Sequence, residues 1–116
     1  MSYTDSQYER VKQILLDHRG ADDPITSREI DDELNMDNIG SFPNTRECIR
    51  DIMFQERIPI VGGNQGYYVA KSEEEIAEAI EGLEGRIMNM TERKMALRRA
   101  ANEVDYVDED DDYDVL

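Results

Sequence analysis

The chain has 116 residues, of which 28 are Asp or Glu and 13 are Lys or Arg, so its formal net charge is -15 at pH 7. This length suits one compact domain with an attached helix or tail. A single cysteine, Cys48, excludes an internal disulfide, and the lack of a signal-type segment or a long apolar run predicts a soluble intracellular protein.

A first helix is expected near the start of the chain. In "DSQYERVKQILLDHRG", Tyr8, Val11, Ile14 and Leu15 recur at helical spacing and share one face, and Gly20 supplies the stop. Trp is absent and Phe occurs only twice. The core that this face helps to build must therefore be aliphatic, with contributions from Met and Tyr.

A second helix is expected over about 27–34. Thr26 and Glu29 form a capping-box pattern, in which each side chain satisfies a free backbone amide at the start of a helix. Ile30 and Leu34 then form its buried face. The polar, Gly- and Pro-containing stretch "NMDNIGSFPN" connects this helix to the next element.

A third helix is expected over about 45–55, because Asn44 and Glu47 offer another capping box. Its apolar positions point one way: Cys48, Ile49, Ile52 and Met53. Its opposite face carries Arg46, Glu47 and Arg50. The stretch "RIPIVGGNQGYYV", residues 57–69, follows and predicts two short strands around a Gly-Gly-Asn-Gln-Gly turn.

Ile25 and Thr26 follow Pro24 as a short extended piece between the first two helices. The order helix, short strand, helix, turn, helix, strand, glycine turn, strand over about 8–70 resembles a winged helix-turn-helix domain. The segments "TRECIRDI" and "RIPIVGGNQGYYVAKSEEE" are similar to small phage and prophage proteins of this family. Two features depart from the pattern. Arg57 stands where a Gly is expected before "IPI", and the wing from Gly62 to Gly66 has no Lys or Arg. We assign residues 1–71 to this domain.

The resemblance implies binding to double-stranded DNA, with the third helix in the major groove and the wing at the backbone or the minor groove. The implied contacts are Arg28, Asn44, Thr45, Arg46, Arg50, Asn64 and Gln65. Arginine can form two hydrogen bonds with guanine and asparagine two with adenine. The alternative for Arg46 and Arg50 is ion pairing with Glu47 or Asp51, and for Asn64 and Gln65 it is ordinary turn chemistry.

A long helix is expected over 72–102, opened by a capping box of Ser72 and Glu75. Apolar side chains alternate in steps of four and three, the spacing of a coiled-coil seam. This seam consists of Ile76, Ile80, Leu83, Ile87, Met90 and Leu97, with Lys94 as its one polar member. We expect it to form a homodimer interface; the alternative is that the stripe packs on its own domain.

The charges of this long segment are segregated, with six glutamates preceding the basic residues from Arg86 to Arg99. In an antiparallel pair the acidic half of one helix would face the basic half of the other, although the same order also complements a helix dipole. Gly82 and Gly85 would mark a kink or a close helix crossing. Residues 103–116, "EVDYVDEDDDYDVL", are expected to form an acidic, disordered tail.

Catalysis finds little support in the sequence. His18 is the only histidine, Cys48 lies on the apolar face of the third helix, and no Cys and His set has zinc-ligand spacing. The stretch "NMDNIG" begins like a calcium loop, but its twelfth position is Arg46 rather than Glu. We therefore expect no enzyme activity, no metal, no cofactor, no small-molecule substrate and no membrane contact.

The acidic excess has to be reconciled with DNA binding. At about 1 M salt the Debye length falls to roughly 3 Å, so self-repulsion fades and so does the attraction between basic residues and phosphates. Arg-over-Lys usage with many carboxylates resembles the proteins of haloarchaea and their viruses, which work in such a medium. An acidic partner-binding protein or a DNA mimic would have a similar composition.

Together these patterns predict an α+β, mostly helical fold: a winged helix-turn-helix with a long C-terminal dimerisation helix. The expected function is sequence-specific binding of double-stranded DNA as a dimeric transcription regulator in a high-salt cytoplasm. The alternatives are an excisionase-like or replication accessory DNA-binding protein, and an acidic protein-interaction module that has lost DNA binding.

Overall fold

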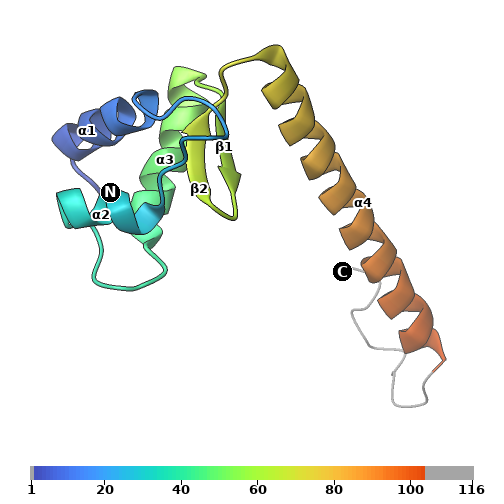
Figure 1. Cartoon of the computed structure of the whole chain (residues 1–116). Coiled ribbons are helices and arrows are strands. Elements are labelled where there is room, and N and C mark those ends of the chain that lie inside the picture. Colours follow the sequence, from blue (N-terminus) through green and yellow to red (C-terminus); the bar gives the residue numbers. More distant parts are fainter. Residues whose placement is uncertain (1, 104–116) are drawn as a thin grey trace. The chain divides into compact units, whose positions relative to one another are not determined.

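A computed structural model of the chain describes residues 2–103. The fold is α+β and mostly helical. Its elements, in order, are α1 (Asp5–Leu16), α2 (Ser27–Leu34), α3 (Pro43–Glu56), β1 (Ile60–Gly63), β2 (Gly66–Val69) and α4 (Glu73–Asn102) (Figure 1). The chain divides into two units, residues 1–77 and residues 78–116. The expected tail lies outside the described residues except for Glu103.

The first two helices begin at local capping boxes. Thr4 caps α1 together with Gln7, a pair that the sequence analysis did not identify, and Thr26 caps α2 together with Glu29, as predicted. In each box the threonine hydroxyl accepts from one backbone amide and the partner side chain accepts from another. The α1 helix ends at Leu16, ahead of the predicted stop at Gly20.

The hairpin is antiparallel, with Ile60 opposite Val69 and Gly63 opposite Gly66. The other edge of β2 is also paired, because Ile25 forms an isolated antiparallel bridge with Tyr67. Gly66 lies against this bridge at φ +124°, and a Cβ there would lie 2.5 Å from the carbonyl oxygen of Ile25. Only glycine fits this close backbone approach at a positive φ.

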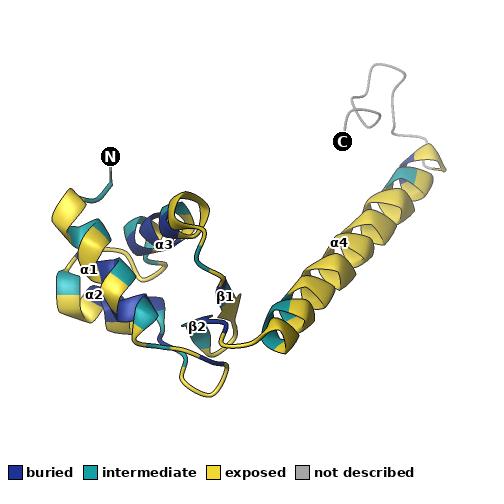
Figure 2. Cartoon of the chain, turned by 90° about the horizontal axis from the view of Figure 1, so that it is seen from above, coloured by how far each residue is buried: buried dark blue, intermediate teal, exposed yellow. Residues whose placement is uncertain are grey.

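The core of the first unit is aliphatic, as the sequence predicts. It lies between α1, α2, α3 and the hairpin, where the buried parts of these elements face one another (Figure 2). Partly buried Tyr3, Tyr8 and Tyr67 pack against it. The buried side chains are Val11, Ile14, Leu15, Ile25, Ile30, Met36, Cys48, Ile49, Ile52, Ile60 and Val69. Met53, which was expected on the buried face of α3, is 40% exposed instead.

The start of α4 is attached to the first unit. The Ser72 hydroxyl accepts from the Glu75 amide, but the Glu75 carboxylate accepts from the amides of Lys71 and Ala21 rather than from Ser72. The Ala21 amide first and the Lys71 amide second lower the pKa of Glu75. Only the first half of the predicted capping box therefore forms, and its glutamate connects the helix start to the loop after α1.

The helix α4 continues through Gly82 and Gly85. Figure 2 shows it exposed along almost all of its length. The expected seam is largely open to solvent from its second position onward: Ile80, Leu83, Ile87, Met90 and Leu97 are 50–69% exposed. Ile76 is half-buried. These five apolar side chains therefore have little cover from α4 itself.

Candidate nucleic-acid interface

The start of α3 is held by an aspartate from the preceding loop. Asp37 accepts hydrogen bonds from the backbone amides of Asn44 and Thr45, at 2.7 and 2.9 Å, and from the Thr45 hydroxyl at 2.7 Å. The predicted capping box of Asn44 and Glu47 is wrong, because α3 already begins at Pro43 and its N-cap, Phe42, makes no side-chain cap. Asp37 satisfies two of the amides that a helix start leaves free.

Two residues that were predicted to contact DNA, Asn44 and Thr45, form hydrogen bonds within the protein. Thr45 is completely buried, and its hydroxyl donates to Asp37. Asn44 is half-buried, and its side-chain amide donates to the carbonyl of Met36 at 2.9 Å. Both residues thus bind the start of α3 to the loop that precedes it. Because Thr45 is buried, a contact of its side chain with DNA is excluded in this conformation.

All three carboxylates of α3 are engaged by residues from the start of the chain. Glu47 accepts from the Ser2 hydroxyl, and Asp51 accepts from the hydroxyl of Tyr3. Glu56 accepts from the Tyr8 hydroxyl at 3.0 Å and forms an ion pair with Lys12 at 3.5 Å. The acidic side chains of α3 therefore contact the N-terminal segment and α1.

These contacts raise the pKa of two tyrosines. The hydrogen bond to Asp51 is the main cause for Tyr3, followed by burial. For Tyr8, burial comes first and the hydrogen bond to Glu56 second, and its pKa rises to about 12. Both hydroxyls therefore remain protonated donors at neutral pH, which keeps these contacts intact.

Arg46 and Arg50 remain exposed on α3. Among the described residues neither forms an ion pair, so the alternative in which they pair with Glu47 or Asp51 does not occur here. The Arg50 guanidinium lies over the ring of Phe54, 5.1 Å from its centroid. We call Arg46, Arg50 and Phe54, which follow one another at steps of four, the arginine face.

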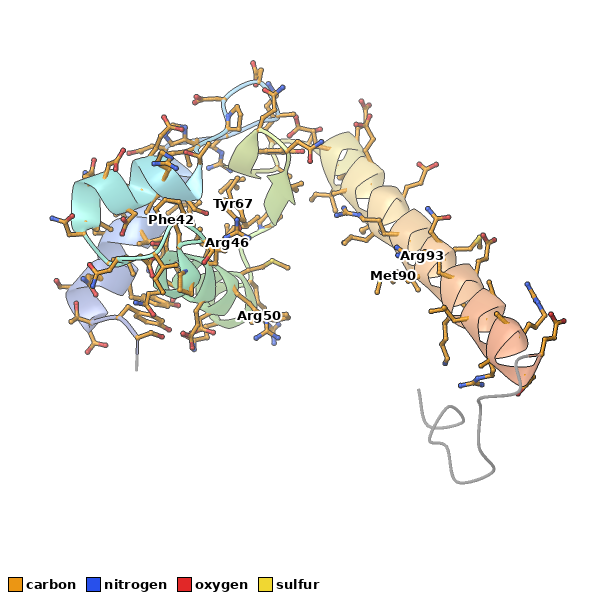
Figure 3. The ribbon with its side chains drawn as sticks, turned by 90° about the horizontal axis from the view of Figure 1, so that it is seen from below. Phe42, Arg46, Arg50, Tyr67, Met90 and Arg93 are labelled. Atoms are coloured by element: carbon orange, nitrogen blue, oxygen red, sulfur yellow. The ribbon has the colours of Figure 1, made fainter. Side chains whose placement is uncertain are left out.

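A second arginine-phenylalanine pair lies at the start of α3. The guanidinium of Arg28, from the first turn of α2, lies 5.4 Å from the ring centroid of Phe42. Phe42 itself has φ +54°, a left-handed conformation that is uncommon for a bulky residue. In the view of Figure 3, Phe42, Arg46 and Tyr67 lie between α2, α3 and the hairpin, and Arg50 lies further along α3.

The hairpin turn contributes polar but uncharged side chains. Asn64 and Gln65 connect β1 to β2, and both are exposed. The ring of Tyr67 covers Gly62, whose added Cβ would lie 3.1 Å from it. Both predicted residues are therefore accessible, but no basic side chain stands in the turn.

Arg57 is a candidate that the sequence analysis did not include among the contacts. It is the C-cap of α3, with φ +56°, and it is exposed. This left-handed conformation is the reason why glycine is favoured at such a position. The absence of the expected Gly before "IPI" was the sequence signal that could have identified it.

Two observations bear on metal binding and on thiol chemistry in the described residues. They contain no group of three His, Cys, Asp or Glu side chains that could hold a metal ion. Burial, followed by the charges of Asp51 and Glu47, raises the pKa of the Cys48 thiol to about 12. Cys48 is therefore a packed thiol and not an activated nucleophile.

Comparisons of the chain with protein-family models, curated proteins and solved structures find no match. Among residues 2–103, none of the helices combines the length and the apolar character needed to cross a membrane.

Proposed function

We propose that the protein binds double-stranded DNA in a sequence-specific manner and acts as a dimeric transcription regulator. In this proposal residues 1–71 work as a winged helix-turn-helix, with α3 in the major groove and the β1-β2 hairpin as the wing. The order of α1, α2, α3 and the hairpin supports this arrangement. Arg46 and Arg50 contact base edges, Arg28 contacts a phosphate, and Asn64 and Gln65 approach the backbone.

The observation that carries the proposal is the separation of charge on α3. Its three carboxylates are engaged by Ser2, Tyr3, Tyr8 and Lys12, whereas Arg46 and Arg50 are exposed and unpaired within the described residues. A helix with this distribution offers donors to DNA without placing its acids against phosphates. Arg46 and Arg50 thus offer two exposed cations on a helix whose carboxylates are hydrogen-bonded elsewhere, although the whole chain carries -15.

The overall charge supports a high-salt setting, such as the cytoplasm of a haloarchaeon or a cell infected by its virus. Much of ordinary DNA affinity comes from counterion release, which declines as salt rises. A chain with few basic residues has little of this affinity to lose. Base contacts and shape fit must then supply a larger share of the binding energy.

Dimerisation through α4 completes the proposal. The apolar seam Ile80, Leu83, Ile87, Met90 and Leu97 is exposed, and no ion pair forms within α4 among the described residues. Its glutamates precede its basic residues, so an antiparallel second copy would bury both seams and bring opposite charges together. We therefore propose a homodimer formed by antiparallel α4 helices.

Fluorescence anisotropy tests the DNA-binding proposal. The full chain is titrated with DNA duplexes, including the upstream region of its own gene, in about 0.2 M and about 1 M KCl. Selective binding that persists at high salt and is lost in the Arg46→Ala, Arg50→Ala double variant supports the proposal. Arg10→Ala is the matched control, because Arg10 lies on α1 and pairs with Glu33.

A second candidate function is an acidic protein-interaction module that has lost DNA binding. The uncharged turn from Gly62 to Gly66 favours it, because it gives the hairpin no cation for phosphates. Absence of binding to any duplex at both salt concentrations, with the dimer intact, would replace the DNA proposal by this one. An excisionase-like or replication accessory role would instead appear as selective binding accompanied by strong DNA bending.

A further inference from the structure

Phe54 stands out on the arginine face because it is an apolar side chain in a row of arginines. It is 63% exposed, near the end of α3. Single exposed apolar residues are common on protein surfaces and need no explanation by themselves. Phe54 differs because the guanidinium of Arg50 lies 5.1 Å from its ring centroid and because Arg46, Arg50 and Phe54 share one side of the helix.

We propose that Phe54 is a specificity-determining residue that contacts the 5-methyl group of a thymine beside the base pair read by Arg50. The inference rests on the proposed function, since it places α3 in the major groove. Thymine is the only base that presents a methyl group there, and phenylalanine is one of the side chains that make apolar contact with it. The predicted preference is therefore a guanine with a thymine next to it.

The contact between the two side chains supports this assignment. Stacking against an aromatic ring restricts the guanidinium plane of Arg50 and so prepares it for a paired hydrogen bond with guanine. Successive bases along one strand are about 3.4 Å apart. The separation of 5.1 Å between the Arg50 guanidinium and the Phe54 ring lies between one and two such steps, so the two side chains can reach neighbouring base pairs.

The chemistry of this contact also suits an acidic protein at high salt. A contact between a ring and a methyl group releases no counterions, so salt does not screen it as it screens phosphate contacts. Phe54 would thus contribute specificity under the conditions in which the electrostatic share of binding is smallest.

The test compares thymine with uracil, which lacks only the methyl group. A duplex is first selected from a random library by the full chain in about 1 M KCl. Its thymines are then replaced by uracil one at a time, and the Kd is measured by anisotropy. The Arg50→Ala variant should lose the preference for guanine at one position of this duplex. We expect the replacement of the thymine beside that guanine to weaken binding about four-fold, which corresponds to the burial of one methyl-sized group.

Variants of Phe54 test whether this side chain causes the preference for thymine over uracil. Phe54→Ala should bind the thymine and uracil duplexes equally, whereas Phe54→Leu should retain part of the preference. Ile39→Ala is the matched control, because Ile39 is 62% exposed but lies outside α3, and it should retain the full preference. Circular dichroism checks that each variant is folded.

The outcomes separate the two proposals. Equal binding of thymine and uracil duplexes by the wild type, with binding still dependent on Arg46 and Arg50, would overturn the role of Phe54 and leave the DNA-binding function standing. A thymine preference that survives in Phe54→Ala would also overturn it. Failure of the wild type to select any duplex would overturn both.

Discussion

Asp37 and Thr45 form a paired contact in which one carboxylate oxygen accepts both the amide and the hydroxyl of Thr45, at 2.9 and 2.7 Å. The other oxygen accepts the Asn44 amide at 2.7 Å. Asp31 stabilises the start of the loop between α2 and α3, since its carboxylate accepts hydrogen bonds from the amides of Met36 and Asp37. These carboxylates determine where α3 begins and hence how its arginine face is presented.

Replacing Asp37 by Ala should lower the free energy of unfolding by about 1–2 kcal/mol, the range for loss of a helix cap. The change removes the acceptor for two amides and one buried hydroxyl. Urea denaturation measures it. Asp32→Ala is the matched control, because Asp32 is exposed on α2, and it should change stability little. Equal stability of the two variants would contradict the capping role.

The same contact predicts a dependence on pH. Burial alone would raise the pKa of Asp37, but the hydrogen bonds from the Thr45 hydroxyl and the Asn44 and Thr45 amides outweigh it, and the pKa is lowered. The stabilisation is therefore complete above the unfolded value of about 3.9 and is lost as the pH falls through the lower folded pKa. Between about pH 5 and pH 2, the wild type should lose more stability than Asp37→Asn, as measured by urea denaturation at each pH. Parallel curves would show that the charge of Asp37 is not involved.

Arg57 predicts a conflict between stability and binding. Arginine at φ +56° is strained relative to glycine, so Arg57→Gly should raise the free energy of unfolding by about 1 kcal/mol. We also expect this variant to bind DNA more weakly, because an exposed cation beside the arginine face is lost. Denaturation and anisotropy measure the two effects.

Asn35→Gly controls for the backbone effect. Asn35 is the C-cap of α2 at φ +53°, and asparagine tolerates this conformation, so its replacement should gain less stability. A loss of stability in Arg57→Gly would instead mean that the guanidinium stabilises the C-terminus of α3, as cations do at helix ends.

The exposed seam of α4 predicts the oligomeric state. Leu83→Glu together with Ile87→Glu should convert the dimer to a monomer without unfolding residues 1–77, because both side chains are exposed within their own chain. Sedimentation equilibrium measures the mass at low and high salt. Asn89→Glu adds charge beside the seam rather than in it and should leave a dimer. A monomeric wild type at both salt concentrations would remove the dimer from the proposal.

The thiol of Cys48 reports on global unfolding. It has no exposed surface, and burial raises its pKa to about 12. A thiol reagent at pH 8 should therefore modify native protein at a rate that rises with urea in parallel with unfolding. Rapid modification in the absence of urea would show that α3 opens locally.

The sequence alone determined most of the secondary structure, because capping and periodicity act over three or four residues. Thr26 and Glu29 identified α2 with its observed bounds, and the apolar repeat identified the long α4 helix. The alternation of strand and glycine turn likewise identified the β1-β2 hairpin. In each case the contacts that decide the structure lie between neighbours in the sequence.

The tertiary structure decided which side chains are free to act. Asp37 caps α3 from seven residues away, so the local pattern at Asn44 was misleading. Ser2, Tyr3 and Tyr8 engage the α3 carboxylates from 45 to 48 residues away. Burial and ion pairing depend on what packs against a helix and not on the sequence of the helix alone. The tertiary structure therefore decided that Thr45 is buried, and that Arg46 and Arg50 are exposed and form no ion pair among the described residues.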